Sequence, residues 1–184
     1  RILYTAFFFI AQYWLPLLSF FAALCMIGGN LMAIRQTDIK RMLAYSSIAQ
    51  AGYMMAGMVA ADYAGMKAVM FYAMLYVFAN VGAFAVLTVV DAARGGTTHR
   101  HITGLAQSAP LLAAVMTVSL LSMAGIPPTA GFAGKIYIFT AAVDQGYLWL
   151  AFIGFVMSMI SVYYYLLVAK AMYRDLTPEE ESCA

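Results

Sequence analysis

The stretch from Ala109 to Ala142, APLLAAVMTVSLLSMAGIPPTAGFAGKIYIFTAA, decides the fold of this chain. A continuous helix of this length would measure about 50 Å, whereas the hydrocarbon core of a bilayer is about 30 Å thick. The run therefore has to bend or break. Proline removes a backbone donor and glycine tolerates the resulting conformations, so we predict a broken helix marked by four residues: Gly125, Pro127, Pro128 and Gly131.

Lys135 follows the predicted break within the same apolar run. Asp144 is the first acidic residue beyond it, about 13 Å farther along a helix, which places the lysine near the middle of the membrane. An ammonium in hydrocarbon costs about 2.5 to 3.5 kcal/mol on insertion scales, so such a lysine usually faces protein or a wet cavity. We interpret it as a proton or ion site. The alternative is that Lys135 snorkels to an interface and the prolines only kink a packed helix.

The composition places the whole chain in a membrane. Of its residues, 65% are hydrophobic and 10% charged, and the mean hydropathy is +0.85, whereas about 25% of residues are charged in soluble domains. A net charge of +2 without a basic run gives no reason to expect nucleic acid as a partner. Cys25 and Cys183 have no spacing typical of a disulfide framework or a metal site, so we expect free thiols and no metal.

The apolar runs predict an all-α, polytopic membrane helix bundle of about five transmembrane helices, one of them discontinuous. The expected spans are Tyr13–Ile34, Ile39–Ala61, Met66–Val90, the broken run and Tyr147–Met172, with Ile2–Ile10 as the end of an earlier helix. We expect one membrane domain over residues 1–174 and a polar, disordered tail over 175–184. Because the chain opens with Arg1 rather than Met, we expect a fragment of a longer protein.

Two of the expected helices carry polar residues at helical spacing. One stripe holds Lys40 and Ser47 with Gln50 close to the same face and Ser46 at its edge, and the other holds Tyr72, Tyr76 and Asn80. One interpretation is an access path for protons. The other is that these side chains hold helices together by hydrogen bonds, or, for the tyrosines, by packing.

The segments between the spans predict the topology. Thr37 and Asp38 are candidate N-caps, and the stretch from Asp91 to Gly104, which contains His99 and His101, is expected to be a solvated loop. An alternating arrangement puts most basic residues on one side, which the positive-inside rule makes cytoplasmic. These residues are Arg35, Lys40, Arg41, Arg94, Arg100, Lys170 and Arg174, with Lys67 on the other side; Tyr163, Tyr164 and Tyr165 are expected to be interfacial anchors.

Two segments resemble the antiporter-like membrane subunits of respiratory complex I. They are GNLMAIRQTDIKRMLAYSSIAQAGYM, from Gly29 to Met54, and LLAAVMTVSLLSMAGIPPTAGFAGKIYIF, from Leu111 to Phe139. The resemblance implies that the chain is the second half of an inverted-repeat fold. It also implies a broken helix whose central lysine is Lys135, and a second lysine, Lys40, along a polar interior. Gln50 departs from the pattern, since some relatives have a histidine there.

The same resemblance implies a function and partners. It implies proton translocation driven by quinone reduction elsewhere in the complex, with Lys135 and Lys40 as the transporting lysines. The chain would hold no cofactor, and NADH, FMN, iron-sulfur clusters and quinone would belong to other subunits, so it would be a non-redox part of a translocase. The expected partners are other membrane subunits, the lipid bilayer, protons and water, and the expected location is a bacterial inner membrane.

Two other functions remain open at this point. A subunit of a multisubunit cation/proton antiporter or of a membrane-bound hydrogenase would share the broken helix. A structural membrane subunit would hold Lys135 as a paired, inert charge, and exchange of that lysine would leave transport intact.

Overall fold

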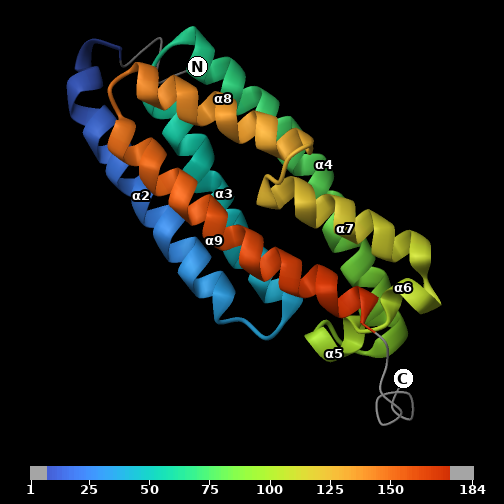
Figure 1. Ribbon diagram of the computed structural model, residues 1–184. Helices are drawn as coiled ribbons and strands as arrows, with labels where there is room; N and C mark the ends of the chain where they lie inside the picture. The colour runs from blue at the N-terminus through green and yellow to red at the C-terminus, as the bar shows by residue number, and fades with distance from the viewer. Residues whose placement is uncertain (1–7, 175–184) are drawn as a thin grey trace.

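The computed structural model describes residues 8–174, and within this range the regular elements are all helices (Figure 1). A short 3-10 turn, η1 (Phe8–Ile10), leads into α2 (Ala11–Ile34), which packs along α3 (Ile39–Val59). The long helix α4 (Tyr63–Arg94) follows, then two short helices, α5 (His99–Ile102) and α6 (Leu105–Ser108). The broken run forms α7 (Pro110–Ala124) and α8 (Ala130–Asp144), and α9 (Leu148–Tyr173) closes the bundle.

Three of these helices, α2, α4 and α9, are long and apolar enough to cross a membrane. Helix α3 is 21 residues long but carries the predicted polar stripe, and α7 is an apolar helix of 15 residues. The predicted all-α membrane bundle with a discontinuous helix is therefore confirmed. The expected tail, Cys183 and most of Ile2–Ile10 lie outside the described residues.

Close helix contacts depend on small residues. A Cβ added at Gly52 would lie 2.8 Å from the Met26 side chain and 2.9 Å from the Ala22 carbonyl, so α2 and α3 approach each other there. Helix α4 contacts both α7 and α8 and forms a continuous support for the two halves of the broken run. A Cβ at Gly134 would lie 2.7 Å from the Tyr72 ring, which marks the contact between α8 and α4.

Most basic residues of the described range gather at one end of the bundle, as predicted, whereas Lys67 lies at the other end. The C-terminal ends of α2, α4 and α9 and the N-terminal end of α3 lie at the same end of the bundle as α5 and α6. The N-terminal end of α4 and the C-terminal end of α8 lie at the opposite end (Figure 1). Which end faces the cytoplasm stays a prediction.

The predicted loop Asp91–Gly104 is wrong in part. Residues 91–94 continue α4, and His99–Ile102 form a helical turn. The segment is not fully solvated, because Thr97 and Ile102 are buried against the bundle. The Thr98 hydroxyl lies 2.7 Å from Nδ1 of His101, and partial burial lowers the pKa of the His99 imidazole. The described residues contain no group of acidic, histidine or cysteine side chains that could hold a metal ion.

Candidate functional site

The break between α7 and α8 follows directly from the local sequence. Helix α7 ends at Gly125, whose φ of 77° lies in the left-handed region, and the Gly125 N–H bonds to the carbonyls of Leu121 and Ser122. In an uninterrupted helix, the N–H groups of residues 127 and 128 would bond to the carbonyls of Met123 and Ala124. Both residues are prolines and have no N–H, so these two carbonyls lose their helical donors.

The prediction that Gly131 belongs to the break, by contrast, is wrong. Gly131 lies in the first turn of α8, where a Cβ would come within 1.8 Å of the Ser122 carbonyl oxygen. Its missing side chain therefore allows α8 to approach the end of α7. The break itself spans Gly125 to Thr129, with Pro127 and Pro128 at its centre.

Lys135 occupies the acceptors that the prolines leave free. Its side chain is 3% exposed, and its Nζ donates to the carbonyl of Met123 at 3.0 Å and to that of Ala124 at 2.9 Å. A third bond runs to the Ser158 hydroxyl on α9 at 2.8 Å, and the Tyr53 ring centroid lies 4.9 Å away. The C-terminal end of α7 adds the negative end of a helix dipole. The lysine is thus held by neutral groups.

No carboxylate neutralises Lys135 within residues 8–174, where the ion pair found is Lys40 with Asp91. The predicted alternative of a paired, inert charge therefore has no partner in this range. Snorkelling to an interface is also not observed, since the Nζ turns toward the interior.

Gln50 is the centre of a second buried cluster, next to the lysine. Its side-chain nitrogen donates to the Met123 carbonyl at 3.1 Å and to the Tyr165 hydroxyl at 3.4 Å, and its oxygen accepts a hydrogen bond from the Tyr72 hydroxyl. Two of the predicted path residues, Gln50 and Tyr72, are thus brought together with Lys135.

A third cluster was missed at the level of sequence. Asn30 donates to the Tyr53 hydroxyl at 3.3 Å and accepts from the Tyr164 hydroxyl at 2.9 Å. Tyr164 and Tyr165 are buried rather than interfacial, because the run of tyrosines is helical and only Tyr163 points outward. The one signal in the sequence is Asn30 itself, an amide within an apolar span.

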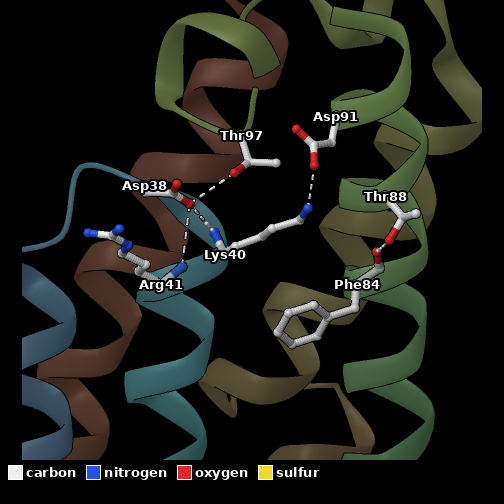
Figure 2. A network of polar contacts seen from close by, with 7 residues as sticks. All are labelled: Asp38, Lys40, Arg41, Phe84, Thr88, Asp91 and Thr97. Carbon is white, nitrogen blue, oxygen red and sulfur yellow. Dashed lines mark hydrogen bonds and ion pairs between the residues drawn. The ribbon is translucent and has the colours of Figure 1, made fainter. Parts of the chain in front are cut away.

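Lys40 lies at the basic end, apart from these clusters, and forms an ion pair with Asp91 at 2.5 Å (Figure 2). Asp38 is the N-cap of α3, as predicted, and its side chain accepts from the backbone N–H groups of Lys40 and Arg41 and from the Thr97 hydroxyl. The Ile39 N–H bonds to the Thr97 carbonyl at 2.9 Å. These contacts join the beginning of α3 to the segment after α4.

The remaining predicted path residues lie between the two regions. The hydroxyls of Ser46 and Ser47 donate to carbonyls of their own helix, those of Leu43 and Ala44. Tyr76 is half-buried, and the Oδ1 atom of Asn80 is buried without a hydrogen-bond partner. A cavity of about 10 Å³ lies between α4 and the broken helix. Its lining includes Tyr72, Tyr76, Ser122, Met123 and Gly131.

Fold and site together define a class: a polytopic membrane helix bundle whose discontinuous helix presents free carbonyls to a buried lysine. A family described as NADH:quinone oxidoreductase/Mrp antiporter, transmembrane, matches residues 1–161. The chain belongs to this family.

The relatives of the chain agree with this assignment. Over 162 residues it is 59% identical to NADH-quinone oxidoreductase subunit N of Heliobacterium modesticaldum, covering 88% of this chain and 34% of the relative. The subunit N of Desulforamulus reducens is 56% identical over 173 residues, with coverage of 94% and 36%. The chain therefore spans about a third of the length of these curated relatives.

Solved structures with the same fold include respiratory complex I from Thermus thermophilus with bound aureothin, at a TM-score of 0.77 and 35% identity, covering 91% of this chain and 40% of that one. The Mrp complex from Dietzia sp. has a TM-score of 0.87 at 26% identity, covering 97% and 33%.

Proposed function

We propose that this chain is part of a proton-translocating membrane subunit of an NADH:quinone oxidoreductase, located in a bacterial inner membrane. In this proposal Lys135 is the residue whose protonation changes during transport. The chain would be a non-redox part of the translocase, and NADH, FMN, iron-sulfur clusters and quinone would bind to other subunits. The bacterial relatives named subunit N support the assignment.

The observation that carries the proposal is the neutral environment of Lys135. Its three acceptors are two backbone carbonyls and a hydroxyl. With a buried carboxylate as partner, loss of the proton would leave an unpaired negative charge, which costs several kcal/mol. With neutral partners no such ion remains. The ammonium form is stabilised by three donated hydrogen bonds and the α7 dipole, and the neutral amine leaves only neutral groups behind.

A path toward the basic end is supported by the arrangement of polar groups. Gln50 reaches the carbonyl that Lys135 also binds, and Tyr72 bonds to Gln50. The small cavity beside Tyr72 and Tyr76 is close to the volume that one water molecule needs, about 10 to 15 Å³. Ser46, Ser47, Tyr76 and Asn80 lie on the two helices that lead from there toward Lys40 and Asp91. We propose that bound water completes this path.

Replacement of Lys135 by alanine in the full-length protein tests the proposal. We expect NADH-driven acidification of inverted membrane vesicles to fall severely, while the amount of assembled complex in the membrane stays close to that of the wild type. Lys170→Ala, which removes an exposed lysine of α9, is the matched control and should pump normally. Normal pumping by the Lys135→Ala complex would remove the claim.

A second function, cation/proton antiport, is favoured by one observation, the high TM-score of 0.87 to the Mrp complex. The identities of 59% and 56% to subunit N relatives, against 26% to the Mrp structure, favour the complex I assignment. Transport that requires sodium and proceeds without NADH oxidation would favour the antiporter assignment over the complex I assignment.

A further inference from the structure

A groove with both signs of charge lies at the end of the bundle opposite the Lys40–Asp91 ion pair. It is formed by the N-terminal part of α4 and the C-terminal part of α8, which lie at the same end of the molecule (Figure 1). Its volume is about 340 Å³, within the range of about 300 to 1,000 Å³ that is typical of small-molecule sites. Lys67 and Asp144 line it together with Phe71, Tyr137 and Thr140.

The two charges in this groove do not neutralise each other. Lys67 and Asp144 form no ion pair within residues 8–174, where the one ion pair found is at the other end of the bundle. The Lys67 ammonium instead lies 4.3 Å from the centroid of the Tyr63 ring. Both side chains are exposed. The groove therefore presents a separate cation and a separate anion to a ligand.

The rest of the lining is suited to a lipid. Phe71 and Tyr137 meet edge to face, with centroids 5.9 Å apart, and are 43% and 59% exposed, so their rings form an outward-facing apolar wall. Exposed aromatic side chains near the ends of membrane-spanning helices typically lie at the level of the lipid headgroups. Tyr137 and Thr140 also line the groove, and each carries a hydroxyl that can donate a hydrogen bond.

We propose that this groove binds one phosphatidylethanolamine molecule, with its phosphate at Lys67 and its primary ammonium at Asp144. Among common headgroups, phosphatidylglycerol brings no cation for Asp144, and its negative charge would be repelled by that carboxylate. The quaternary ammonium of phosphatidylcholine has no N–H to donate. Phosphatidylethanolamine matches both charges and the donor.

The test uses the full-length protein in its purified complex, reconstituted into phosphatidylcholine nanodiscs that contain a photoreactive phosphatidylethanolamine. We expect cross-links to peptides from 63–71 and 137–144, which excess unlabelled phosphatidylethanolamine removes and phosphatidylglycerol does not. Lys67→Gln should lower this labelling about fivefold, the effect of one basic contact near a membrane surface. Lys170→Gln, at the other end of the bundle, should leave it unchanged.

A second variant separates headgroup recognition from general lipid contact. Asp144→Asn should shift the competition toward phosphatidylglycerol, because the repulsive carboxylate is gone. Labelling that phosphatidylglycerol and phosphatidylethanolamine remove equally in the wild type would overturn the proposal. So would an absence of cross-links in the assembled complex, which would mean that protein covers the groove.

Discussion

Gln50 and Lys135 donate hydrogen bonds to the same carbonyl oxygen, that of Met123, at 3.1 and 3.0 Å. A carbonyl oxygen has two lone pairs and accepts both bonds here because Pro127 supplies no helical N–H. Helices α3 and α8 thus meet at the broken end of α7. A change in the protonation of Lys135 alters the charge on its Nζ, which bonds to the same carbonyl oxygen as Gln50, so the two side chains are expected to act together.

Replacement of Gln50 by leucine should therefore reduce pumping and stability together. It removes a donor to Met123 and the acceptor of the buried Tyr72 hydroxyl, and a buried polar group left without a partner costs about 1 to 3 kcal/mol. We expect a lower thermal midpoint of the complex and slower NADH-driven proton uptake into vesicles. Gln50→His, which keeps a ring N–H donor, is the matched variant. Equal loss in both variants would contradict the role of the hydrogen bond.

Ser158→Ala should slow pumping without removing it. The substitution deletes one of the three acceptors of the Lys135 ammonium and leaves two carbonyls, and a hydrogen bond to a charged group contributes about 1.5 to 3 kcal/mol. Ser161→Ala is the control, because the Ser161 hydroxyl bonds to the Ser158 carbonyl in its own helix. We expect the proton-to-electron ratio to fall below that of the wild type in Ser158→Ala and to stay at the wild-type value in Ser161→Ala. Identical ratios in the two variants would argue against a direct role of Ser158.

Variants at Lys40 and Asp91 distinguish a relay from a structural ion pair. The pair is partly exposed, with relative exposures of 36% and 42%, so its loss should change the free energy of unfolding by about 0 to 1 kcal/mol. If Lys40 transfers protons, Lys40→Gln should slow pumping more than Asp91→Asn, which breaks the same pair but keeps the amine. The measurement that distinguishes these roles is the pumping rate of each variant, normalised to the amount of assembled complex. Equal rates would assign both residues a structural role.

Gly131→Ala should prevent correct packing at the break. A Cβ at this position would lie 1.8 Å from the Ser122 carbonyl, so the ends of α7 and α8 have to separate. We expect a clear loss of assembled complex in membranes, measured on native gels. Gly28→Ala is the control, since a Cβ there meets nothing within 4 Å. Normal assembly of the Gly131→Ala complex would show that the contact is not required.

Much of the fold could be predicted from the sequence because its main determinants are local. The position of the break follows from Pro127 and Pro128, and the cap of α3 follows from Asp38. Gly131 was misassigned because glycine serves two purposes, turns and close contacts, which the sequence does not distinguish. Tyr164 and Tyr165 were misassigned for a similar reason. A tyrosine suits both a headgroup region and a buried hydrogen-bond network.

The sequence by itself determined that a lysine lies beside a helix that cannot continue, because the loss of a backbone donor at proline and the cost of an ammonium in hydrocarbon are properties of single residues. The tertiary structure decided which groups meet it. The Met123 and Ala124 carbonyls, Ser158 and Gln50 come from three helices, and the partner of Lys40 proved to be Asp91, 51 positions away in the chain. Such contacts depend on how helices pack, and helical spacing within one segment carries no information about the residue that faces it from another.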